Sequence, residues 1–97
     1  MRLSKDMLVA ITIHKYQPVI YTDLVRIMKG IVDEIEIPPI LASLSSWGIT
    51  ETEYRFNGRV YMISPDADIM ISETRELWEE EQKKGSIWWR IKKKLRL

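Results

Sequence analysis

The sequence contains no cysteine, and this absence excludes several kinds of site at once. The chain can form neither a disulfide nor a thiolate metal centre, and it has no cysteine nucleophile. His14 is the only histidine, so neither a zinc site made of histidines nor a nucleophile with a histidine base can be assembled. We therefore expect no catalytic residue, no metal, no cofactor and no enzymatic activity, and a location in the reducing cytoplasm.

Long apolar runs and internal repeats are missing as well. Polar residues at Thr12, His14 and Lys15 interrupt the first apolar stretch, so we expect neither a secretory segment nor a membrane span there. The 97 residues, of which 45% are hydrophobic, suffice for one modest core. The many Ile, Glu and Lys residues and the single Asn are typical of proteins from thermophiles.

The net charge is only +1, but the charged residues are strongly segregated along the chain. Residues 1–30 are mainly basic and residues 31–60 mainly acidic. Residues 61–82 carry seven acidic groups against the single cation Arg75, whereas residues 83–97 carry seven basic groups and no acidic one. The surface is therefore expected to consist of separate charged patches.

A first helix is predicted between Ser4, which is a good N-cap, and Pro18, which cannot continue a helix. Its apolar positions recur at a spacing near 3.6 residues: Met7, Leu8, Ile11 and Tyr16. Val19 and Ile20 then form a short extended link.

Two shorter helices follow in the prediction. Thr22 caps a second helix over residues 23–29, and Gly30 occupies the position where glycine commonly ends a helix. A third helix starts no earlier than the prolines at 38–39, because a proline biases the residue before it away from helical geometry, and it stops at Gly48.

A β-hairpin and a fourth helix complete the predicted order. Residues 49–56 alternate apolar and charged side chains, Asn57-Gly58 is a strong two-residue turn signal, and residues 59–63 form the return strand. Ser64-Pro65-Asp66 combines an N-cap, a proline and an acid, and opens a helix that extends to about Lys84. Its buried stripe is predicted to contain Ala67, Ile71, Thr74 and Trp78.

Three helices, a hairpin and a long helix are the element order of a winged helix-turn-helix domain. The expected fold is mostly α with a small β-hairpin (α+β), in which a three-helix core carries the wing. We expect a DNA-binding domain over residues 1–64, followed over residues 65–97 by a C-terminal helix and a basic amphipathic tail.

The residues add a family resemblance to this order. The segment IPPILASLSSWGIT (residues 37–50) resembles the third helix and following turn of PadR-type transcriptional regulators, on positions Pro39, Leu41, Leu44, Gly48 and Ile49. The segment NGRVYMISP (57–65) is similar to the wing exit of that family, and YTDL (21–24) to the start of its second helix. The resemblance covers roughly residues 7–80. Pro38 departs from it, because the family usually has an aromatic or polar residue there.

A winged helix places the exposed face of its third helix in the major groove and its wing against the neighbouring backbone or minor groove. The exposed positions of the third helix offer hydroxyl groups and small apolar contacts, but no arginine pair for guanine: Pro38, Ala42, Ser43, Ser45 and Ser46. The expected phosphate contacts come from the second helix and the wing: Thr22, Arg26, Lys29, Arg55, Asn57 and Arg59. The alternative for each cation is an ordinary solvated charge.

The basic tail admits several explanations. The PadR resemblance implies a homodimer whose C-terminal helices pair, and the side chains that suit such an interface are Leu77, Trp78, Trp88 and Ile91. Trp88-Trp89 beside five cations also resembles a helix at a membrane surface, and the cations could form an arm for phosphates. Packing of the tryptophans onto their own core is the remaining alternative. Dimerisation is favoured, since adjacent tryptophans are costly to leave in water.

The sequence thus predicts a homodimeric DNA-binding transcriptional regulator that contacts double-stranded DNA. The alternative is a winged helix adaptor that binds protein. Three carboxylates just before the third helix, Asp33, Glu34 and Glu36, motivate this alternative, because acidic groups close to a phosphate backbone reduce affinity.

Overall fold

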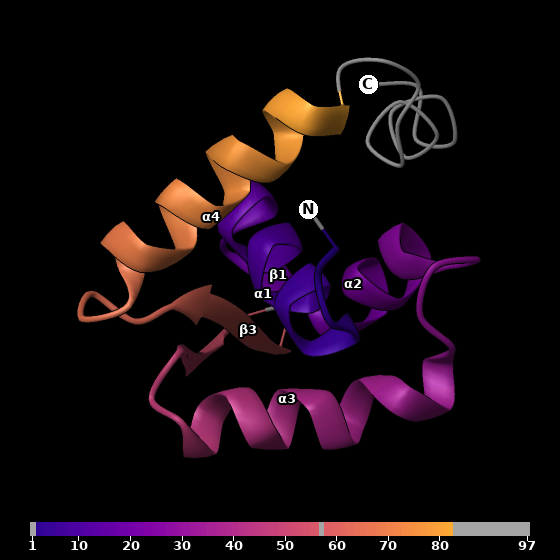
Figure 1. Ribbon diagram of the computed structural model, residues 1–97. Helices are drawn as coiled ribbons and strands as arrows, with labels where there is room; N and C mark the ends of the chain where they lie inside the picture. The colour runs from indigo at the N-terminus through magenta and orange to yellow at the C-terminus, as the bar shows by residue number, and fades with distance from the viewer. Residues whose placement is uncertain (1, 57, 83–97) are drawn as a thin grey trace.

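The computed structural model describes residues 2–56 and 58–82, which form an α+β structure. This part contains four α-helices, one short 3-10 helix and a three-stranded antiparallel sheet (Figure 1). The elements in chain order are α1 (Lys5–Tyr16), β1 (Val19–Ile20), α2 (Tyr21–Met28), η1 (Glu34–Glu36), α3 (Ile37–Ser46), β2 (Thr50–Arg55), β3 (Gly58–Ile63) and α4 (Asp68–Glu81). None of the helices in the described ranges is long and apolar enough to cross a bilayer.

Helix α1 lies at the centre of the molecule. Ser4 caps it as predicted, because its side-chain oxygen accepts a hydrogen bond from the Met7 backbone N–H at 3.2 Å. The five consecutive residues from Val9 to Ile13 are all buried, which differs from the predicted stripe of Met7, Leu8, Ile11 and Tyr16. A helix surrounded on all sides by other elements has no solvent face, and α1 packs against α3, α4 and β3.

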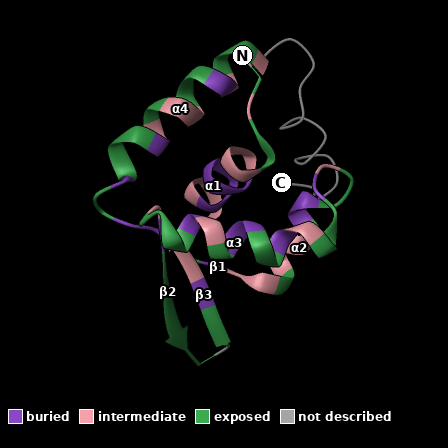
Figure 2. Cartoon of the chain, turned by 60° about the horizontal axis from the view of Figure 1, so that its bottom comes forward, coloured by how far each residue is buried: buried purple, intermediate pink, exposed green. Residues whose placement is uncertain are grey.

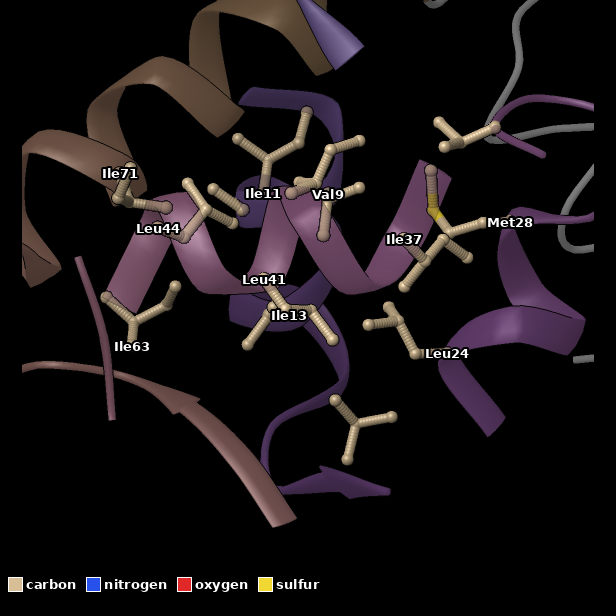
Figure 3. Close-up of a cluster of buried hydrophobic side chains, with 14 of the residues drawn as sticks. Val9, Ile11, Ile13, Leu24, Met28, Ile37, Leu41, Leu44, Ile63 and Ile71 are labelled. Carbon is tan, nitrogen blue, oxygen red and sulfur yellow. The ribbon is translucent and has the colours of Figure 1, made fainter. Parts of the chain in front are cut away.

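Helix α3 supplies much of the core opposite α1. Its buried residues Ile37, Ile40, Leu41 and Leu44 lie on one face. Figure 3 shows Ile37, Leu41 and Leu44 beside the α1 side chains, with Ile63 and Ile71 next to Leu44. The helix starts one residue before the predicted prolines, since Ile37 has helical angles (φ −66°, ψ −47°). Ile37 precedes a proline, and a residue before proline is biased away from helical geometry. A capping box between Asp33 and Glu36 stabilises the turn that leads into Ile37.

Helix α2 begins at Tyr21, so the prediction that Thr22 is its N-cap is wrong. The N-cap is Ile20, whose backbone also belongs to β1, and no side chain caps the helix. The chain therefore turns directly from a paired strand into a helix. The predicted end is confirmed: Lys29 is the C-cap, and Gly30 follows with φ 85°, a left-handed conformation that glycine adopts without strain.

The sheet has the strand order β1-β3-β2. The predicted link at Val19 and Ile20 is extended as expected, and it also pairs with β3 opposite Tyr61 and Val60. The predicted hairpin is confirmed, but its register pairs Arg55 with Gly58. Strand β3 thus starts one residue earlier than predicted, and the φ of 110° at Gly58 explains why a glycine is needed there. Asn57 lies outside the described residues.

Helix α4 starts four residues after its predicted N-cap. The Ser64 hydroxyl instead donates a hydrogen bond of 2.6 Å to the Gly48 carbonyl oxygen, which ties the start of α4 to the base of the hairpin. The turn after it leads to Ala67, the actual N-cap. Ala67, Ile71 and Trp78 of the predicted stripe are buried, and Thr74 is half-buried. The predicted continuation to Lys84 and the amphipathic tail fall outside the described residues.

Candidate nucleic-acid interface

A groove of about 320 Å³ lies between α3 and the hairpin, and the first residue of α2 contributes to it. Its lining side chains come from all three elements: Tyr21, Pro38, Leu41, Ala42, Ser45, Thr52, Arg59 and Tyr61. None of these described lining residues is acidic, and four of the eight carry a hydroxyl group. The hairpin extends away from the helices beside this groove (Figure 2).

Helix geometry divides the α3 residues that were predicted to contact DNA. Successive residues are 100° apart around a helix, so Pro38, Ala42 and Ser45 share the side that faces the hairpin, and all three line the groove. Ser46 lies about 180° from the buried face and is exposed, and Ser43 lies half-buried on the other flank. The structure therefore brings together Pro38, Ala42 and Ser45, but not Ser43 and Ser46.

The hairpin register divides the predicted wing residues in the same manner. Tyr54 is opposite Arg59, and Thr52 is opposite Tyr61, so these four side chains share the face that contributes to the groove. Arg55 belongs to the other face, where it forms an ion pair of 3.1 Å with Glu53. Of the two predicted wing arginines, only Arg59 is directed to the groove.

Arg59 is held by tyrosines. Its guanidinium donates a hydrogen bond to the Tyr54 hydroxyl and lies over the Tyr54 ring, with Cζ 5.1 Å from the ring centre. Hydrogen bonds to Tyr54 and then to Tyr61 raise the pKa of Arg59 above its ordinary value. A planar cation that is positioned by aromatic groups, and not neutralised by a carboxylate, remains available to an anionic partner.

The predicted α2 contacts form a separate surface. Thr22, Arg26 and Lys29 line a hollow of about 420 Å³ together with Asp33 and Glu34. Arg26 forms an ion pair with Asp23 one helical turn away. The mixed charge makes this hollow a weaker attractor for phosphate than the groove, although exposed ion pairs of this kind are easily broken.

Two of the three carboxylates before α3 have structural partners. Asp33 and Glu36 form the capping box, in which the Glu36 carboxylate accepts the Asp33 backbone N–H at 3.2 Å. Glu36 also forms an ion pair of 2.8 Å with Lys5. The hydrogen bond from Lys5, and then the one from the Asp33 backbone, lower the pKa of Glu36 below its ordinary value. Asp33 and Glu36 thus have a structural role at the start of α3.

The two predicted dimer residues that the structure describes, Leu77 and Trp78, differ in their exposure to solvent. Trp78 is only 2% exposed and belongs to the core, whereas Leu77 is 54% exposed on the outer side of α4. Trp88 and Ile91 lie outside the described residues. The half-buried His14 has a structural role between α1 and α4, since its ring nitrogens lie 2.9 Å from Arg75 Nη1 and 3.4 Å from Asp68 Oδ1.

The sequence reasoning missed three hydroxyl-bearing residues of the groove, Tyr21, Thr52 and Tyr61, and also Tyr54, which holds Arg59. The period-two alternation of the hairpin strands was the available signal for three of them, because it places Thr52, Tyr54 and Tyr61 on the face of Arg59. Such a surface can donate hydrogen bonds to phosphate oxygens and stack on planar groups. No protein-family model, no curated protein and no solved structure matches this chain.

Proposed function

We propose that the chain is a winged helix protein that binds double-stranded DNA as a transcriptional regulator similar to those of PadR type. In this proposal α3 enters the major groove with Pro38, Ala42 and Ser45 towards the bases, and the β2–β3 hairpin is the wing. The order of helices and strands supports this reading, and so does the exposure of β2, of which only Thr50 is buried. Five of the six residues of β2 are exposed, so this strand is accessible to a partner along most of its length.

The observation that carries the proposal is the position of Arg59. The groove contains hydroxyl groups that suit phosphate and base edges, and Arg59 is its cation. Since tyrosines orient the guanidinium, less conformational freedom is lost when it binds a phosphate than for a mobile lysine. Recognition by hydroxyl and small apolar groups favours modest sequence preference, with much of the affinity coming from the DNA backbone.

The proposed regulator is a homodimer. The outer side of α4 supports this part of the proposal, because Ile69, Met70 and Leu77 are exposed there. Trp78 is occupied in its own core, so the seam would use Leu77 and not Trp78. Light scattering on the full-length protein measures the mass directly, and a mass of one chain at all concentrations would remove the dimer from the proposal.

The test compares two arginines of the same hairpin. Fluorescence anisotropy with a random duplex across a salt series should give a steep negative slope of log affinity against log salt. We expect Arg59→Gln to weaken binding about tenfold at low salt and to reduce the slope by about one unit, as loss of one phosphate contact does. Arg55→Gln changes the net charge equally on the opposite face of the hairpin, and it should have a much smaller effect.

Equal effects of the two substitutions would mean that the hairpin attracts DNA only through its overall charge. Absence of any DNA binding at low salt by the wild-type protein would exclude the DNA-binding proposal. It would direct attention to a protein partner for the same surface.

A further inference from the structure

The tip of the hairpin carries a feature that backbone binding does not require. Phe56, the only phenylalanine of the chain, follows β2 at the tip and is fully exposed. Tyr54 nearby is 74% exposed. Burial of a phenylalanine side chain stabilises a fold, and Phe56 makes no such contribution because it is fully exposed.

The geometry keeps Phe56 away from the body of the protein. Strand β2 has six residues and spans about 20 Å at the usual rise per residue. Only its first residue, Thr50, is buried, and the hairpin projects from the helices (Figure 2). Among the residues that the structure describes, Phe56 therefore takes no part in the core, and it is the first apolar side chain that a partner of the hairpin tip meets.

The surroundings of Phe56 favour nucleic acid as that partner. Arg55 and Arg59 lie on either side of the tip, and the nearest acid, Glu53, neutralises only Arg55. Arg59 stacks on the Tyr54 ring, so the end of the hairpin presents flat aromatic and guanidinium surfaces of the kind on which bases stack. A single phenylalanine between cations offers little apolar area to a lipid surface or to a protein interface core.

We propose that Phe56 is a wedge that inserts between bases, and that the chain consequently prefers duplex DNA with an unstacked position over fully paired DNA. The inference deepens the proposed function and rests on it. Insertion into an intact duplex must first separate stacked base pairs, which costs a few kcal/mol per step, and this cost is least where a base is already unpaired. Arg59, which has tyrosine partners, holds a flanking phosphate while the ring enters.

The test uses two duplexes of the same length, one fully paired and one with a central two-nucleotide bulge that carries the fluorescent base 2-aminopurine. We expect the wild-type protein to bind the bulged duplex about tenfold more tightly, the scale of one base stacked on an aromatic ring. Binding should also change the fluorescence of the base. Phe56→Ala should remove both effects and keep the affinity for the paired duplex.

The matched control is Ile69→Ala, which removes an exposed apolar side chain from α4, outside the hairpin. This variant should still bind the bulged duplex more tightly than the paired one, and it should still change the fluorescence of 2-aminopurine. Equal binding of both duplexes by wild type and Phe56→Ala would overturn the wedge but leave DNA binding intact. Failure to bind either duplex would instead reject the proposed function. If the protein bound anionic lipid vesicles through Phe56 and showed no preference between the two duplexes, the wedge would be overturned. Phe56 would then be a contact to a membrane surface.

Discussion

Glu36 shows how a residue close to the candidate interface can serve the fold. Its carboxylate bonds Lys5 and the backbone of Asp33, and both contacts lower its pKa below the ordinary value of 4.5. A carboxylate with a lower pKa in the folded state stabilises the protein above its unfolded pKa, and this contribution is lost as the pH falls through the folded pKa. Glu36→Gln should therefore lower the melting temperature by a few degrees at pH 7. The difference should shrink as the pH falls below 4.5 and vanish once the Glu36 carboxylate is protonated in the folded protein.

Thermal unfolding followed by circular dichroism between pH 3 and 7 measures this difference. Glutamine can still accept the Asp33 N–H, so the substitution isolates the charge. Glu34→Gln is the control, because it changes the same net charge beside Glu36 but outside the ion pair with Lys5. A pH-independent difference for Glu36→Gln would show that packing, and not the ion pair, is responsible.

At the scale of residues, the sequence predicted which side chains carry charge but not what each one contacts. The cations Arg26, Arg55 and Arg59 were all expected to contact phosphate. Two of them have carboxylate partners, Asp23 and Glu53, and the third has tyrosines. A partner across a strand pair depends on the register. A two-residue turn at Asn57-Gly58 would pair residue 56 with residue 59, whereas the structure pairs Arg55 with Gly58, so each β2 residue faces a β3 residue two positions earlier than the turn signal implies.

At the scale of elements, the sequence predicted the order of helices and strands, but only one of its three predicted N-caps, Ser4, is correct. Ser4 has no competing partner and caps α1 as expected. Ser64 has a carbonyl oxygen of Gly48 within 2.6 Å, and it bonds that group in preference to the start of α4. This partner comes from a segment 16 residues earlier, so only the folded chain reveals it.

The orientation of α4 gives a prediction from two adjacent residues. Trp78 is 2% exposed and Leu77 is 54% exposed. Trp78→Ala should therefore lower the free energy of unfolding by about 3–5 kcal/mol at any protein concentration, and Leu77→Ala by less than about 0.5 kcal/mol where the protein is a single chain. Urea unfolding at two protein concentrations measures both. A large loss for Leu77→Ala that appears only at the higher concentration would place Leu77 in the dimer seam. A large loss at both concentrations would contradict the observed orientation of α4.

At the scale of the whole molecule, α1 explains why the short chain folds. In the described part of the chain the other three α-helices and β3 pack against it, so a single core forms around α1. The order of elements predicted this α+β arrangement, but the central position of α1 was not visible in its sequence. Thr12 and His14 made the helix look partly polar. In the structure the Thr12 hydroxyl donates to the Leu8 carbonyl oxygen at 2.7 Å, which satisfies it inside the core.

The distribution of charge over the whole molecule gives the last prediction. The chain carries +1, and seven of its cations and none of its acids follow residue 82, so residues 1–82 alone carry −6. A protein truncated after Gln82 keeps the described core, and we expect it to unfold cooperatively. Its affinity for DNA at low salt should fall at least tenfold, because a net negative body repels the phosphate backbone.

Charge and length can be separated by a second variant, in which Lys92, Lys93 and Lys94 are replaced by Gln in the full-length chain. If the tail acts through charge, this variant should lose part of the affinity and shift the salt dependence in the same direction as the truncation. If the tail instead holds two copies together, the truncated protein should scatter light as a single chain while the glutamine variant remains a dimer. An unchanged affinity in both variants would leave the groove and Arg59 as sufficient for binding, and the tail would need another role.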